Sequence, residues 1–74
     1  MMIEVFKTNV TDRDKANWLI DQIQDCYTDY TASFDLEDRD RVLVVKCTSG
    51  KVQPSGVIEL LKTSGYMAEV LPDE

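Results

Sequence analysis

The sequence contains no histidine and only two cysteines, Cys26 and Cys47, which are too far apart to form a CxxC pair. Soft metal ions are bound in proteins mainly by thiolate and imidazole groups, so the chain lacks the usual ligands of a zinc or copper site. In a reducing compartment, such thiols are most often buried and unpaired, and they act as small hydrophobic side chains. We therefore expect both cysteines in the core.

Long apolar runs are also missing. No segment could cross a bilayer, and the first residues, MMIEVFKTN, lack the long apolar stretch of a signal peptide. We expect a cytoplasmic protein that does not enter a membrane. Positive charge is scarce as well, and the net charge of −6 repels the phosphate backbone of nucleic acids while permitting a basic protein partner.

The composition and the hydrophobic pattern predict one small globular domain over residues 1–74, because 43% of the residues are hydrophobic and 30% are charged. Alternating or continuous apolar segments predict strands, and three- and four-residue apolar steps predict helices. Thr11 or Asp12 is expected to cap the first helix, and Gly65 to end the second in a left-handed conformation. The predicted strands cover residues 2–10, 30–36, 41–48 and 66–71, and the predicted helices cover residues 11–27 and 54–64.

This βαββαβ order is that of the ferredoxin-like α+β sandwich. Two right-handed crossovers place both helices on one face of a four-stranded antiparallel sheet. The expected strand order is 4-1-3-2. The other face of the sheet has no helix over it.

Three segments carry a resemblance to a known family: FKTNV, ASFDLEDRDRVLVV and VIELLKTSGYMAEVL. They resemble the first strand, the second hairpin and the last helix and strand of heavy-metal-associated domains, which are found in copper chaperones and metal-transporting ATPases. The resemblance extends over nearly the whole chain and implies the same ferredoxin-like fold. In that family, the loop after the first strand carries two cysteines that hold a metal ion.

The metal loop is where this sequence departs from the family. When the chain is aligned from Val10, the two ligand positions fall at Asp12 and Lys15. A carboxylate is a hard oxygen ligand, and an ammonium group repels cations, so neither replaces a thiolate for a soft ion. We expect no metal and no cofactor at this degenerate loop. The alternative is a protein related to metal transport that binds metal through non-standard ligands, either Cys26 or Cys47 or the acidic loops.

Two acidic segments could attract a hard cation, but each has a simpler interpretation. TDRD at residues 11–14 offers few oxygens, and carboxylates at a helix start favour capping. DLEDRD at residues 35–40 lacks the glycine and the distal glutamate of a calcium-binding EF-hand loop, which favours a solvated hairpin turn.

Other functions known on this architecture need residues that this chain lacks. A small-molecule regulatory domain of the ACT type usually has a glycine-bearing loop after the first strand, and TNVTDRD has no glycine. An acylphosphatase-like hydrolase needs an anion cradle. Asn9, Arg13 and Asn17 lie close in sequence, but no glycine-rich nest accompanies them. We therefore do not expect an enzyme.

Trp18 is one candidate for contact with a partner. At 100° per residue it falls nearly opposite the apolar stripe of the first helix, among Asp14, Asp21 and Asp25. Exposed tryptophan is common at binding hot spots. The alternative is a surface tryptophan that packs on its own helix or on a neighbouring loop.

The uncovered sheet face is the second candidate. Alternation predicts that Val42 and Val44 face away from the helices, and the family pattern places Ile3 and Val5 beside them. Such an apolar patch usually marks an interface with a protein partner or a second copy. The alternative is a set of scattered aliphatic residues interrupted by charged neighbours. The sequence therefore favours a protein-interaction or self-associating module.

Overall fold

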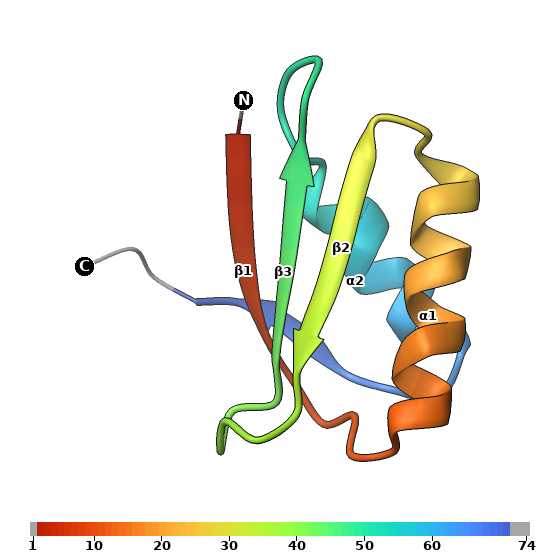
Figure 1. Ribbon diagram of the computed structural model, residues 1–74, viewed down its shortest axis with the longest axis vertical. Coiled ribbons are helices and arrows are strands. Elements are labelled where there is room, and N and C mark those ends of the chain that lie inside the picture. Colours follow the sequence, from red (N-terminus) through yellow and green to blue (C-terminus); the bar gives the residue numbers. More distant parts are fainter. Residues whose placement is uncertain (1, 72–74) are drawn as a thin grey trace.

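A computed structural model describes residues 2–71 of the chain. Four strands and two helices follow one another in the predicted βαββαβ order (Figure 1). The elements are β1 (Met2–Thr8), α1 (Arg13–Cys26), β2 (Tyr30–Asp35), β3 (Val42–Cys47), α2 (Pro54–Thr63) and β4 (Ala68–Val70). Strand β4 has three residues instead of the six predicted. In the part of the chain that is described, neither helix is long and apolar enough to cross a membrane.

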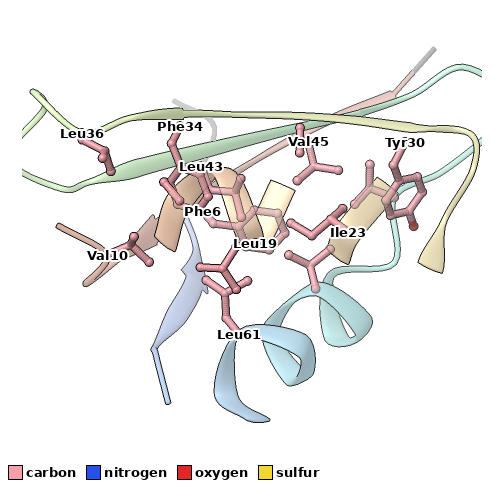
Figure 2. Packing of buried hydrophobic residues seen from close by; sticks show 14 of the residues in the cluster. Phe6, Val10, Leu19, Ile23, Tyr30, Phe34, Leu36, Leu43, Val45 and Leu61 are labelled. Carbon is pink, nitrogen blue, oxygen red and sulfur yellow. The ribbon is translucent and has the colours of Figure 1, made fainter. Parts of the chain in front are cut away.

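The strands form one antiparallel sheet in which β1 and β3 are central and β2 and β4 are the edges. Read from the β4 edge, the order is β4-β1-β3-β2, which is the order predicted for the ferredoxin-like sandwich. Both helices lie on the same side of the sheet, and the hydrophobic side chains fill the space between the two layers (Figure 2). The opposite side of the sheet has no element over it (Figure 1).

Helix α1 begins and packs as its sequence predicts. The Asp12 carboxylate accepts the backbone N–H of Asp14 at 3.0 Å, which satisfies one of the free donors of the first turn. Ala16, Leu19 and Ile23 are completely buried against the sheet. These three residues make the apolar stripe of the helix and fix which of its sides faces the core.

The expectation that Cys26 is a core residue is wrong, because Cys26 is exposed at the last turn of α1, whereas Cys47 is buried. The next inward position after Ile23 is taken by Tyr27. Its ring stacks on Tyr30 with 4.5 Å between ring centroids. The larger aromatic side chain covers more apolar surface at this end of the core, and the thiol is rotated outward.

Helix α2 is positioned by the same two tyrosines. The Tyr30 hydroxyl accepts the backbone N–H of Gln53 at 2.6 Å, just before α2 begins. A side chain at Gly56 would overlap the Tyr27 hydroxyl, so this position needs a glycine for close packing. Gly65 follows the helix with φ of +91°, which confirms the predicted left-handed cap.

Candidate interaction site on the open sheet face

The loop that would hold metal in the resembled family has a structural role here. The Asp12 side chain caps α1 through its contact with Asp14, and both Asp12 and Lys15 are exposed to solvent. Val10 is fully buried and anchors the loop in the core. Over residues 2–71, no group of three or more Cys, Asp or Glu side chains lies close enough together to hold a metal ion.

The acidic turn at residues 36–41 is fastened to the end of β1 by Thr8. The Thr8 hydroxyl donates to the Arg41 carbonyl at 2.6 Å and accepts the Val10 N–H at 3.2 Å. The Thr8 N–H donates to the Asp40 carbonyl at 3.0 Å. Within residues 2–71, Thr8 is the one buried polar side chain, so it joins the turn and the first loop from inside the fold.

Within that turn, one carboxylate accepts a backbone hydrogen bond. The Asp38 carboxylate accepts the Asp40 N–H at 2.8 Å. Arg41 has a left-handed φ of 48°, and its guanidinium donates to the Leu36 carbonyl. The segment is therefore ordered by local hydrogen bonds of its own.

The sheet side without helices brings together the four predicted aliphatic residues. Val5 pairs with Val44 on the neighbouring strand, Ile3 pairs with Lys46, and Val42 is the next residue of β3 on the same side as Val44. Ile3 is 52% exposed, and the other three are half-buried. We call Ile3, Val5, Val42 and Val44 the open face. It occupies the two central strands, away from the sheet edges.

Leu71 adds to the open face although the sequence did not single it out. Its N–H donates to the Val5 carbonyl at 2.8 Å, one step beyond the Phe6–Val70 pair. This register puts Leu71 across from Val5 on the same side of the sheet. The signal in the sequence is weak, because the residue follows a strand of only three residues.

Charged side chains of both signs surround the open face. The register places Lys46 beside Ile3, Asp35 beside Val42, and Glu69 opposite Lys7. All four charged residues are exposed. They contribute two positive and two negative charges, so this side of the sheet is formally neutral, although the whole chain carries −6.

Trp18 lies on a different surface from the open face. It is 48% exposed on α1, in the helical layer on the other side of the sheet. Its exposed neighbours along the helix are Asp14, Asp21 and Asp25, as predicted. The two predicted interaction candidates are therefore separate surfaces, one acidic and one neutral.

Two shallow hollows flank Met67, which is 69% exposed and which the sequence did not single out. Their volumes are about 160 and about 230 Å³. Both are smaller than the roughly 300 Å³ at which pockets for small molecules begin. The Met67 N–H donates to the Asn9 side-chain oxygen at 2.8 Å, which fixes the loop between the hollows. We do not assign a ligand to either hollow.

Comparison with known proteins gives no match for this chain, whether with protein-family models, curated proteins or solved structures. The fold class therefore rests on the strand order and helix placement described above. The resemblance to heavy-metal-associated domains rests on the quoted sequence segments and stays a prediction.

Proposed function

We propose that this chain is a small protein-interaction module, similar to heavy-metal-associated domains, in which the metal loop no longer binds metal and the open face binds protein. The observation that supports this proposal most strongly is the row of aliphatic side chains on the two central strands, with no helix over them. Apolar patches of this kind on an antiparallel sheet usually mark binding surfaces.

The hydrophobic free energy that the open face can still gain on binding is small, as expected for a reversible contact. Full burial of a valine or isoleucine side chain stabilises by roughly 1.5–3 kcal/mol. Ile3 is about half exposed and the other three are already partly covered, so each has about 1 kcal/mol left to gain. The four residues together would contribute on the order of 4 kcal/mol before the cost of association.

The state of the first loop supports the other half of the proposal. Asp12 is used to cap α1, and Lys15 adds a positive charge about three helical turns away from Cys26. Cys47 is buried in the core and Cys26 is exposed at the far end of α1 from this loop. Two unpaired thiols also suit a reducing compartment, which supports the proposed cytoplasmic location.

The binding surface can be tested by site-specific photo-cross-linking in the cells that produce the protein. A benzophenone residue at Ser33, which is exposed and pairs with Val44, should cross-link to protein, whereas one at exposed Glu59 on α2 should not. The protein captured at Ser33 is then purified and titrated against the wild-type chain and Val44→Asp. Placing a carboxylate in an apolar interface should weaken binding on the order of 100-fold. Equal cross-linking at both positions, or unchanged affinity for Val44→Asp, would refute the proposal.

The loop is tested separately by titrating the purified protein with Cu(I) and Zn²⁺ while amide chemical shifts are recorded. We expect no saturable shift at residues 10–15. A stoichiometric shift there would show that the loop binds metal and would favour the alternative function, metal binding through non-standard ligands.

A further inference from the structure

We infer that the open face binds a second copy of this chain, about a twofold axis that lies between the two sheets and runs across their strands. This inference rests on the proposed function of the open face and names its partner. It follows from the placement of charge on the sheet.

The first step concerns where two copies can approach each other. Lys7, Lys46, Asp35 and Glu69 cancel one another on the uncovered side of the sheet. Residues 2–71 hold 8 Lys and Arg and 12 Asp and Glu, so their net charge of −4 resides on the other surfaces. Two copies therefore repel each other through their other surfaces, above all through the acidic outer side of α1. A basic partner would favour those acidic surfaces. A surface that carries charges of both signs and no net charge does not repel a second copy of itself.

The second step concerns orientation, which the register of the strands defines. The uncovered side of the sheet has three rows of residues across the strands, and the middle row contains Ser33, Val44 and Val5. One outer row contains Lys46 and Ile3, and the other contains Val42 beside Asp35. A twofold axis along the middle row brings Val44 and Val5 against their own copies. The same axis lays each outer row over the opposite outer row of the partner.

The charges then pair across the interface. Lys46 of each copy lies over Val42 of the other, one strand away from both Asp35 and Lys7 of that copy, and the symmetry makes this contact twice. Lys7 stands opposite Glu69 in its own sheet, so those two charges cancel and Asp35 is the charge left to pair with Lys46. Sheets pack about 10 Å apart and neighbouring strands lie about 4.8 Å apart, which a lysine and an aspartate can span together. An axis parallel to the strands would instead bring Asp35 over Glu69, because both lie in the row of Val42 and Lys7. Two carboxylates would then face each other, so charge favours the axis across the strands.

The size of the sheet limits the affinity. Four strands at about 4.8 Å and about six residues at 3.3 Å give a face of roughly 400 Å² per copy. This is about half of the roughly 800 Å² per partner in a standard interface. We therefore expect a weak, reversible dimer with a dissociation constant on the order of 0.1 mM.

A charge exchange tests the arrangement. Lys46→Asp and Asp35→Lys should each dimerise at least ten-fold more weakly than the parent in sedimentation equilibrium from about 10 µM to 1 mM, because like charges then meet twice. An equimolar mixture of the two variants should form a heterodimer at least as tight as the parent dimer, because both contacts become Lys–Asp pairs. Lys62→Asp and Asp21→Lys, which make the same charge changes at exposed helical positions, are the matched controls. They should dimerise like the parent, alone or mixed.

The possible outcomes distinguish a failure of this inference from a failure of the proposed function of the open face. A parent that stays monomeric at 1 mM overturns the second copy as partner, and the cross-linking at Ser33 still decides whether the open face binds another protein. A dimer that Val44→Asp leaves intact overturns both. A dimer that needs Val44 but gives no preferred heterodimer in the mixture overturns the twofold axis across the strands.

Discussion

Thr8 offers a quantitative test of how the first loop and the acidic turn are held together. Thr8→Val keeps the shape of the side chain and removes its hydroxyl. The Arg41 carbonyl then loses a donor at 2.6 Å, and the Val10 N–H loses an acceptor at 3.2 Å. Because Thr8 is only 7% exposed, water replaces these partners poorly.

The expected loss follows from those two contacts. A hydrogen bond contributes a net 0.5–1.5 kcal/mol, and leaving a buried group unsatisfied costs roughly 1–3 kcal/mol. We expect Thr8→Val to lower the free energy of unfolding by about 2–3 kcal/mol. Thr8→Ser keeps the hydroxyl and removes one methyl group, so it should cost only about 1 kcal/mol.

Urea unfolding measures these differences, with Thr31→Val as the control. Thr31 is exposed on β2, so the same chemical change there should stay within about 0.5 kcal/mol. Hydrogen exchange gives a local readout, since the Val10 amide should exchange faster in Thr8→Val than in Thr8→Ser. If Thr8→Val is as stable as the parent, the hydroxyl does not fasten the turn and this reasoning is refuted.

Three further outcomes are expected. Gly56→Ala should lower stability in urea by about 1–3 kcal/mol through overlap with the Tyr27 hydroxyl; Tyr27→Phe in the same chain should recover part of the loss, and no recovery would contradict the overlap. Asp12→Ala should lower the free energy of unfolding, measured by thermal unfolding, by about 1 kcal/mol, and Asp12→Asn should lower it much less because asparagine also caps helices. Equal stability of Asp12→Ala and the parent would contradict the cap. Cys26 should react with a thiol reagent in the native protein and Cys47 only after unfolding, and equal rates would contradict the difference in burial.

The fold could be predicted from the sequence because the helices and β2 show a clear hydrophobic period and β3 is almost continuously apolar. The strict alternation of β2 buries Ala32 and Phe34 and exposes Thr31 and Ser33, as expected for a sheet covered on one side. On β3 every residue except Lys46 is apolar, and the two-residue step of a strand places Val42 and Val44 on the side opposite buried Leu43 and Val45. These patterns depend only on which side of an element faces the core, so they need no knowledge of neighbouring side chains.

Details that depend on contacts between elements could not be predicted. Cys26 and Tyr27 both continue the helical period, but Tyr27 takes the inner position and Cys26 is exposed, because Tyr27 stacks on Tyr30 and meets Gly56 on α2. The link from Thr8 to Arg41 joins residues 33 positions apart and leaves no local pattern. Leu71 reaches the open face through pairing with β1, which its short strand does not reveal.

The role of the open face is tested most directly by following amide chemical shifts of the pure protein as it is concentrated from about 10 µM to 1 mM. Self-association through this surface predicts that the changes gather at residues 3–5, 31–35 and 42–46 and that Val44→Asp abolishes them. Changes centred on Trp18 and the outer side of α1, or no change at any concentration, would contradict self-association through the open face.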